Sequence, residues 1–467
     1  YVIVGAPLSG STTSLAGTGS VYIYSKNDNG SWSQEIKIPN PYDSPAATTI
    51  GDWYGSSVGI TKNISGSWVI IGSLNDDNKN VGTFTDAGLV EIRQRSQDLT
   101  TGLVSWSVIN DFEGTAASER YGGNVAINGK YAAFNSQEDP GTYPGGFSGA
   151  TGVVYIKEYV GTSWVADETI SGSHAAFDVG AFGAPALLAG IPLYPYSHKM
   201  IDFSGNRIAV GDLTAEDSGD TIGSVTIFNS GSATGWAVEG VVTGSDMKAV
   251  VAATPSSPLY GCPVSIDGNV LAVGAPSKRN LSNTALFDGG VYIYEYDGSD
   301  WNEVQIIAAF DQNFDYNTNA LGAGFGSAVS LDSNILAIGS WIDSRDGTWA
   351  GLTSLYKKTV KNGQTYFEFL ETISSIDSPS ISGASNPNSR FGVSADLNKN
   401  TLAIGAYYEK EGDASGSAYI KSYCVPDVYF RSSGLDSDGD GAVDRGFTPF
   451  FYNQNVANSN DGRVIVT

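Results

Sequence analysis

The fold is decided by the stretch Tyr260-Gly-Cys-Pro-Val-Ser-Ile-Asp-Gly-Asn-Val-Leu-Ala-Val-Gly-Ala-Pro276, which is followed by Gly290-Val-Tyr-Ile-Tyr294. It holds an aromatic-Gly start, an alternating strand, a second apolar strand that ends at Gly274, and a third strand rich in β-branched and aromatic residues. The same order occurs six times in the 467 residues, with a period of about 65. Such units cannot bury themselves alone, so the period indicates a repeat architecture with one continuous core.

The glycine that ends the apolar strand marks each unit. It stands at Gly5, Gly72, Gly211, Gly274, Gly339 and Gly405, with Asn135 in its place in the third unit. An aromatic-led strand precedes it, although the fourth unit, from Tyr196, lacks the glycine after the aromatic residue. A last strand usually starts at tryptophan: Trp32, Trp106, Trp164, Trp236 and Trp301. Period-2 runs of this composition predict strands, and four strands per unit are typical of a propeller blade. We therefore predict an all-β fold, a seven-bladed β-propeller of four-stranded blades.

Charge and composition exclude several classes of function. The formal net charge of -24 disfavours nucleic acid and anionic membranes as partners. No run of 18 apolar residues occurs, so we expect no membrane insertion. Cys262 and Cys424 fall two repeats apart, and we expect both to be unpaired or packed. Because both ends of the chain read as strands, we expect a piece of a longer protein. The acidic surface fits a secreted protein, and we expect an extracellular or cell-surface location.

The repeat resembles FG-GAP repeats, the blades of the seven-bladed propeller of integrin α-subunits. The resemblance covers residues 1–423 and rests on aromatic-Gly, Gly-Ala-Pro and Gly-x-Val-Tyr-Ile-Tyr. It implies a non-enzymatic binding or scaffolding module. Integrin-type blades hold calcium in Asp-x-Asp-x-Asp-Gly loops, whereas this chain has tight turns there, such as Asp267-Gly-Asn269. Such turns lack the oxygen ligands of a calcium cage, so we expect no metal in the blades.

A calcium loop is predicted instead beyond the last blade. Asp436, Asp438, Asp440, the carbonyl of Ala442, and Asp444 have the ligand spacing of such a loop, with Gly441 at its sharp turn. The glutamate that completes an EF-hand is absent, and a flexible acidic linker is the alternative interpretation. We place this calcium-loop-like extension in a linker, residues 424–451. Residues 452–467 then form a strand that closes the ring on blade one, or begin a further domain.

Recognition is expected on the face that carries the long connections between strands. Candidate partner-binding residues there are Trp53, Tyr143, Phe182, Leu187, Leu188, Tyr194 and Trp349. The apolar insertion that contains Phe182, Leu187 and Leu188 is expected either to cap the ring or to form a patch for another protein.

The supply of catalytic residues is thin, because His174 and His198 are the only histidines. A hydrolase that uses paired loop carboxylates, such as Asp76 and Asp77, is the weakest hypothesis, and we predict that the chain is not an enzyme. We expect an extracellular structural or adhesion propeller, stabilised by calcium, that assembles with other subunits in a surface layer or filament. The alternative is a carbohydrate-binding module. Candidate glycosylation sites are Asn29, Asn63 and Asn280.

Overall fold

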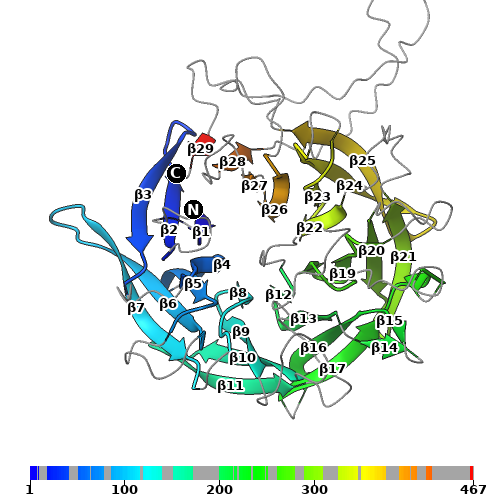
Figure 1. Ribbon diagram of the computed structural model, residues 1–467, viewed down its shortest axis with the longest axis horizontal. Helices are drawn as coiled ribbons and strands as arrows, with labels where there is room; N and C mark the ends of the chain where they lie inside the picture. Colours follow the sequence, from blue (N-terminus) through cyan, green and yellow to red (C-terminus); the bar gives the residue numbers. More distant parts are fainter. Residues whose placement is uncertain are drawn as a thin grey trace, which may run out of the picture.

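Seven small antiparallel sheets are arranged in a ring around a central channel (Figure 1). The computed structural model describes residues 1–7, 9, 18–41, 51–63, 65–77, 86–115, 119–138, 151–171, 199–213, 215–217, 220–232, 235–247, 249–250, 260–278, 289–308, 324–344, 349–374, 389–399, 401–406, 417–422 and 463–465. The predicted all-β, seven-bladed propeller is confirmed.

Each blade follows the chain from the channel outward. Blade one holds β1 (Val2–Ala6), β2 (Ser20–Lys26) and β3 (Trp32–Pro39). Blade two holds β4 (Tyr54–Asn63), β5 (Gly66–Ser73), β6 (Leu89–Gln97) and β7 (Val104–Glu113). Blade three holds β8 (Val125–Ile127), β9 (Tyr131–Glu138), β10 (Thr151–Tyr159) and β11 (Trp164–Ser171).

Blade four holds β12 (Ile201–Ser204), β13 (Arg207–Asp212), β16 (Ser224–Ser232) and β17 (Gly235–Val242), beside a short hairpin of β14 (Glu216–Asp217) and β15 (Asp220–Thr221). Blade five holds β18 (Val264–Asp267), β19 (Val270–Gly274), β20 (Gly290–Tyr296) and β21 (Trp301–Ala308). Blade six holds β22 (Phe325–Asp332), β23 (Ile335–Ser340), β24 (Leu352–Lys361) and β25 (Gln364–Ser374). Blade seven holds β26 (Phe391–Asn398), β27 (Thr401–Ala406), β28 (Ser417–Ser422) and β29 (Arg463–Ile465).

The hydrophobic core lies between the blades. One cluster joins Val225 and Ile227 of blade four to Leu271, Val273 and Tyr292 of blade five. A second joins blade five to blade six in the same way. Alternation along each strand therefore buries one face against the preceding blade and the other against the following blade.

The marker glycines bring neighbouring blades into backbone contact. A Cβ at Gly72 would lie 2.0 Å from the carbonyl oxygen of Gly122 in the next blade, and a Cβ at Gly339 would lie 2.0 Å from that of Gly392. The repeat needs both glycines because no side chain fits between these backbones. The junction of blades three and four lacks both members of the pair, since Asn135 replaces the first and the strand after Tyr196 has no glycine there. The two irregular units are thus neighbours in the ring.

Ring closure involves both ends of the chain. In the described residues blade one has three strands, and β29 pairs with β28 as the outermost strand of blade seven. Residues 452–458, expected to close the ring on blade one, lie outside the described residues, and the predicted boundaries at 423 and 451 stay predictions.

Candidate functional site

Among the described residues, one face of the ring carries hairpin turns between strands, and polar side chains of these turns bond to the next blade. Asn63 Nδ2 donates to the carbonyl of Gly129 at 2.6 Å, and Asn128 Nδ2 donates to that of Gly205 at 2.8 Å. Around the other half of the ring the side chain of the preceding blade is the acceptor and the next blade supplies the donor. Ser204 Oγ accepts from Gly268 N at 2.8 Å, and Asp267 Oδ2 accepts from Ser333 N at 2.6 Å. Asp332 accepts from Lys399 N in the same manner. The Asn and Asp residues of these turns therefore join blades.

A second series of bonds links the inner strands at the channel. Ser57 Oγ accepts from Val125 N at 3.0 Å, Ser265 Oγ from Leu331 N at 3.1 Å, and Ser330 Oγ from Leu397 N at 2.8 Å. Each bond runs from one blade to the next. These polar residues alternate with apolar ones in the strand, and the alternation therefore serves ring assembly as well as burial.

A lysine crosses the channel. Lys199 Nζ lies 2.9 Å from Asp202 Oδ1 in blade four and 3.7 Å from Asp396 Oδ1 in blade seven. Desolvation alone would lower the pKa of the Lys199 ammonium. The two carboxylates have the larger combined effect, and the net result is a raised pKa. Desolvation raises the pKa of the Asp396 carboxyl, and Lys199 only partly opposes this. The three side chains hold one another in place and tie together blades that lie on opposite sides of the channel (Figure 1).

The opposite face receives the long connections, because the strands enter and leave every blade at that end. Two of the predicted partner-binding residues lie there within the described residues. The Arg390 guanidinium carbon lies 4.5 Å from the Trp349 ring centroid and 4.6 Å from that of Trp341. Trp349 is half-buried in this stack, and Trp53 is buried. Both side chains therefore pack within the propeller, and the structure presents neither as an open aromatic platform.

Most of the other predicted site residues lie outside the described residues. They are the partner-binding candidates Tyr143, Phe182, Leu187, Leu188 and Tyr194, the sequon Asn280, Cys424, and the calcium loop Asp436, Asp438, Asp440, Ala442 and Asp444. Within the part of the chain that the structure describes, no three His, Cys, Asp or Glu side chains gather as a metal site. No described helix is both long and apolar enough to span a bilayer.

Two sequons and one cysteine can be placed. Asn29 is exposed in the turn between β2 and β3. Asn63 uses its amide nitrogen in the blade junction described above, and its Oδ1 accepts from Ser65 N at 2.8 Å and from Trp68 Nε1 at 3.2 Å. Cys262 is buried and forms no disulfide, and burial raises the pKa of its thiol.

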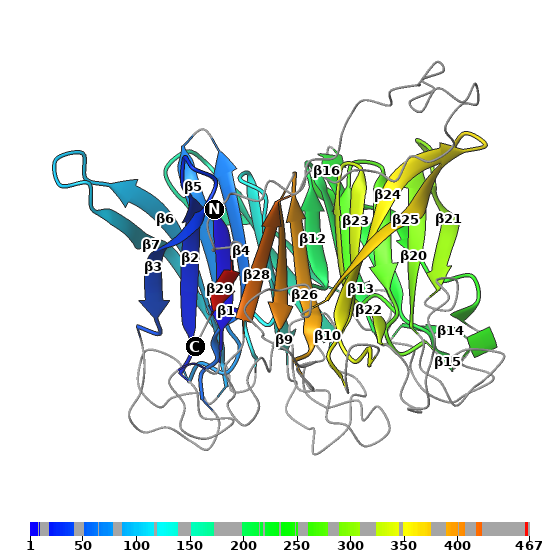
Figure 2. The same cartoon turned by 90° about the horizontal axis from the view of Figure 1, so that it is seen from above.

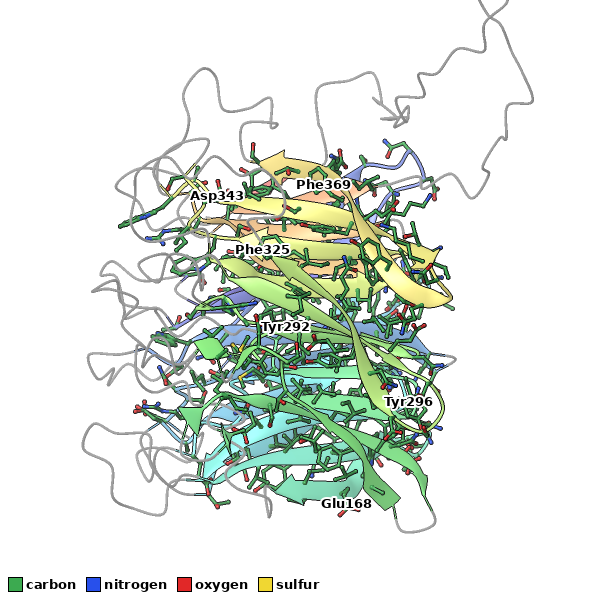
Figure 3. All side chains as sticks on the ribbon, turned by 90° about the vertical axis from the view of Figure 1, so that its right-hand side faces the viewer. Glu168, Tyr292, Tyr296, Phe325, Asp343 and Phe369 are labelled. Atoms are coloured by element: carbon green, nitrogen blue, oxygen red, sulfur yellow. The ribbon has the colours of Figure 1, made fainter. Side chains whose placement is uncertain are left out.

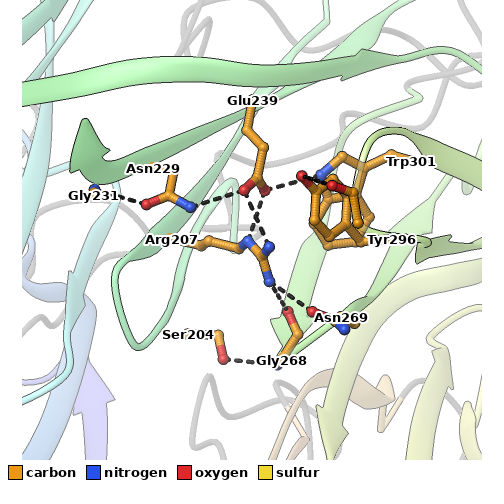
Figure 4. Close-up of polar contacts among 10 residues, drawn as sticks. Ser204, Arg207, Asn229, Gly231, Glu239, Gly268, Asn269, Tyr296 and Trp301 are labelled. Carbon is orange, nitrogen blue, oxygen red and sulfur yellow. Dashed lines mark hydrogen bonds and ion pairs between the residues drawn. The ribbon is translucent and has the colours of Figure 1, made fainter. Parts of the chain in front are cut away.

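A charged clamp joins the outer strands of blades four and five (Figure 4). Arg207 Nε and Nη2 lie 2.6 and 3.1 Å from the two carboxylate oxygens of Glu239. Trp301 Nε1 and Asn229 Nδ2 donate to the same carboxylate at 3.2 and 2.8 Å. Arg207 Nη1 continues to Gly268 O of the next blade at 3.0 Å. Desolvation acts to raise the pKa of Glu239, but the hydrogen bonds from Arg207 and Asn229 outweigh it, and the pKa is lowered.

A similar clamp joins blades one and two, but here the arginine lies in the blade that follows the glutamate and not in the blade of the glutamate itself. Arg95 Nε lies 3.0 Å from Glu35 Oε1, and Trp106 Nε1 lies 2.9 Å from the same oxygen. Glu35 and Glu239 are each the extra residue of a β-bulge in the outer strand, because the register shifts at those positions. Bulges re-aim a side chain and disfavour pairing along an exposed sheet edge. Sequence reasoning missed this clamp, although the spacing Trp-x-x-Glu at Trp32 and Trp236 is a signal for it.

Exposed apolar side chains lie on the outer wall of the ring. Leu99 is 98% and Leu103 71% exposed at the tip of the β6–β7 hairpin, and Val360 is 71% exposed at the end of β24. Figure 2 shows both hairpins reaching beyond the other blades. None of these residues was among the predicted binding residues, because outer-strand positions look like ordinary half-buried strand positions in the sequence.

One family model and several solved structures are similar to this chain. A family model described as FG-GAP repeat matches residues 384–421, in blade seven. A periplasmic gluconolactonase of Pseudomonas aeruginosa is 12% identical, with 88% of this chain and 93% of that chain covered and a TM-score of 0.42. A hypothetical selenium-binding protein of Sulfolobus tokodaii is 10% identical over 90% and 87%, with a TM-score of 0.43.

Sqt1 of Chaetomium thermophilum, solved with the N-terminus of the ribosomal protein L10, is 9% identical over 89% of this chain and 83% of that chain, with a TM-score of 0.39. No curated protein matches the chain. From the repeat we predicted that the chain is not an enzyme. That prediction is wrong, because the similar solved propellers include the gluconolactonase. We withdraw that prediction, and these likenesses bring no particular activity to the chain.

Proposed function

Because this chain is an FG-GAP repeat β-propeller, we propose that it binds other protein subunits outside the cell, on the face that carries its long connections. A propeller of such repeats fits a protein-interaction role. The observation that carries the proposal is the asymmetry of the two faces. On the turn face, the side chains of Asn63, Asn128, Ser204 and Asp267 are used in joining blades. The opposite face is built from long connections on a rigid scaffold, the usual setting of recognition.

The finer proposal is a structural or adhesion role in a surface layer or filament. The net charge of -24 supports an extracellular setting, in which divalent cations screen a strongly acidic surface. Calcium enters the proposal through Asp436, Asp438 and Asp440, whose spacing suits a calcium loop next to the last blade. Calcium bound there would stiffen the connection into β29.

The size of the native particle tests this proposal. We expect ordered polymers in electron micrographs, and we expect them to loosen when a calcium chelator is added. A matched variant carrying Asp438→Asn and Asp440→Asn should resemble the chelated wild type in the presence of calcium. Monomers that ignore calcium and bind no protein from the same surface would overturn the structural role.

Carbohydrate binding is the second candidate function. The observation that favours it is a cavity with aromatic walls between blades five and six, on the outer wall of the ring. This cavity is distinct from the face proposed for protein partners.

A further inference from the structure

The innermost strand of blade seven has an uncovered face. In the described residues, blades two to seven each have an innermost strand, whereas blade one begins with β1 at the second strand position. Between complete blades this strand is covered: in β22, Phe325 is buried (Figure 3), and Ala328 and Ser330 are 5% and 1% exposed. The matching residues of β26 that point toward blade one, Ser394 and Asp396, are exposed. These two side chains mark the open face of β26.

A series of hydrogen bonds between blades leads to this open face. Asp202 Oδ2 of blade four accepts from Ile266 N of blade five at 2.9 Å. Ser330 Oγ of blade six accepts from Leu397 N of blade seven at 2.8 Å. Asp396 is in the same strand position of blade seven, and its side chain is 65% exposed, against 13% for Asp202 beneath the strand that it binds. Asp396 is therefore placed to accept from an innermost strand of blade one.

The marker glycine of blade seven shows the same difference from the other blades. A Cβ at Gly274 would overlap the carbonyl oxygen of Gly326 in the next blade, as at the marker glycines described above. Among the described residues, the atoms nearest to a Cβ at Gly405 belong instead to Ser394 and Val393 of its own blade. The backbone that meets the marker glycine elsewhere is thus not part of the described blade one.

Residues 452–458 have the sequence of an innermost strand. Tyr452-Asn-Gln-Asn-Val-Ala-Asn458 shares its tyrosine, its second asparagine, its valine and its alanine with Tyr121-Gly-Gly-Asn-Val-Ala-Ile127. Asn453 replaces the glycine that follows the aromatic residue in most units. That glycine has φ between +79° and +92° at Gly55, Gly122, Gly261, Gly326 and Gly392. Asparagine is among the few other residues that adopt positive φ.

Blade seven also differs at the residue that would face Asn453. A Cβ at Gly122 would lie 2.7 Å from Val90 Cγ2 of the preceding blade. Val90 is paired with the marker glycine of its sheet, and Ala418 has that position in blade seven. Alanine has no Cγ atom, so this side-chain clash is absent. Two backbone atoms lie 2.9 Å from the Cβ at Gly122, and an innermost strand can shift slightly away from such atoms because its channel side is unpaired.

The chain holds residues 452–458 near the open face. β29 begins at Arg463, which is paired with Tyr419 of β28 in blade seven. An innermost strand ends at the turn face, and so does the start of an outermost strand. The five residues from Asn458 to Arg463 reach about 17 Å when extended. Three strand spacings, from the innermost to the outermost strand, are about 14 Å. The link is therefore long enough, with little slack.

We propose that residues 452–458 dock between the open face of β26 and the inner edge of β1, as the innermost strand of blade one. In this register Asn458 N donates to the Asp396 carboxylate, and Asn453 lies over Ala418. The docking decides between the two places that the sequence leaves open for this segment. It is independent of the proposed function, because neither candidate function uses this junction.

Two features described above are compatible with the docked strand. Asp202 binds both Lys199 and a backbone N–H, so Asp396 can keep its contact with Lys199 while it accepts from the strand. Alanine at Gly405 would displace this one strand, which is a smaller disturbance than the parting of two complete blades by alanine at Gly72.

A double-mutant cycle on the full chain tests the docking. Ala418→Val should lower the thermal midpoint by a few degrees, because the valine meets the side chain of Asn453. Asn453→Gly alone should change the midpoint little. The two changes together should restore it, since valine beside glycine is the combination at Val90 and Gly122. The matched control is Ala418→Val with Asn455→Gly, which alters a neighbouring residue of the same segment and should give no rescue.

Disulfide trapping gives a second measurement. A Cβ that lies 2.7 Å from a valine Cγ is about 4 Å from the valine Cβ, as a disulfide requires. With Cys424→Ser as the background and Cys262 left buried, Ala418→Cys with Asn453→Cys should form an intrachain disulfide on mild oxidation. Ala418→Cys with Ala457→Cys is the control, because Ala457 is four residues, or about 13 Å, further along the strand. Peptide mapping by mass spectrometry identifies the bond.

Rescue in the cycle, or an intrachain disulfide confined to the Asn453 pair, would support the proposal. Absence of both, with circular dichroism showing that the variants are folded, would overturn it. Equal cross-linking of the Asn453 and Ala457 pairs would also overturn it, because it would show a segment without a fixed register. A disulfide that joins two chains on a non-reducing gel would place the strand of a second copy on the open face, against the docking of the chain's own strand.

Discussion

Trp106 Nε1 donates a hydrogen bond of 2.9 Å to Glu35 Oε1 and so joins the outer strands of blades one and two. The same donor and acceptor meet at Trp301 and Glu239, between blades four and five. Between blades two and three the tryptophan remains, but the bulge residue is Ile109. Trp164 Nε1 is buried there without a hydrogen-bond partner among the described residues. A buried donor left in this state costs about 1–3 kcal/mol.

Ile109→Gln should therefore stabilise the protein. The amide oxygen supplies the missing acceptor without burying a charge, and one restored hydrogen bond contributes about 0.5–1.5 kcal/mol. The measurement is the midpoint of urea unfolding. Val108→Gln serves as the control, because Val108 is as exposed as Ile109 but is not the extra residue of the bulge, and it should give no gain. Equal midpoints for the two variants would contradict the clamp model.

The clamp at Glu239 predicts a loss of stability in acid. Hydrogen bonds from Arg207 and Asn229 overcome desolvation and hold the folded pKa of Glu239 below the ordinary glutamate value of 4.5. A group with a depressed folded pKa stabilises the protein fully above its unfolded pKa, and this contribution is lost as the pH falls through the folded pKa. Thermal midpoints between pH 7 and pH 3 should therefore fall more steeply in the wild type than in Glu239→Gln. Parallel curves would show that Glu239 does not titrate in this way.

The sequence predicts the ring well because the repeat carries the constraints of blade packing. Gly72 and Gly339 recur since each faces the backbone of a glycine in the next blade, and periodicity alone reveals them. The contacts of Lys199 with Asp396 could not be predicted, because they join strands far apart in the sequence across the channel. The cavity between blades five and six was hidden for a similar reason, since its walls come from strands of two blades.

The predictions of binding residues were less successful than the prediction of the fold. Trp53 and Trp349 were chosen as large aromatic residues near loops, and the same property makes them good packing residues. The stack of Trp349 on Arg390 depends on a partner that follows a long connection, which no local pattern specifies. Turn residues such as Asp267 were expected to be simple hairpin formers, yet their carboxylates also bond to the next blade.

Gly72→Ala should destabilise the ring. The new Cβ would lie 2.0 Å from the carbonyl oxygen of Gly122, and backbone at this distance cannot yield without opening the junction. Overpacking of this kind costs about 1–3 kcal/mol or more. Gly405→Ala is the matched control, because its nearest neighbour among the described residues is the rotatable hydroxyl of Ser394 in the same blade. Thermal midpoints should rank the wild type, Gly405→Ala and Gly72→Ala in descending order, and equal effects would contradict the pairing of glycines.

Asn29 should be glycosylated more completely than Asn63 when the protein is secreted by a eukaryotic host. Asn29 is exposed in a turn, whereas Asn63 Nδ2, the atom that would carry the sugar, donates to Gly129 O at 2.6 Å in a blade junction. A glycan added before folding would compete with that bond and with the contact between the turns. Site occupancy measured by mass spectrometry of tryptic glycopeptides checks the prediction. Asn63→Gln controls for the loss of the bond without a glycan and should destabilise the protein by about 1 kcal/mol. Full occupancy at Asn63 with an unchanged thermal midpoint would show that the junction opens without cost.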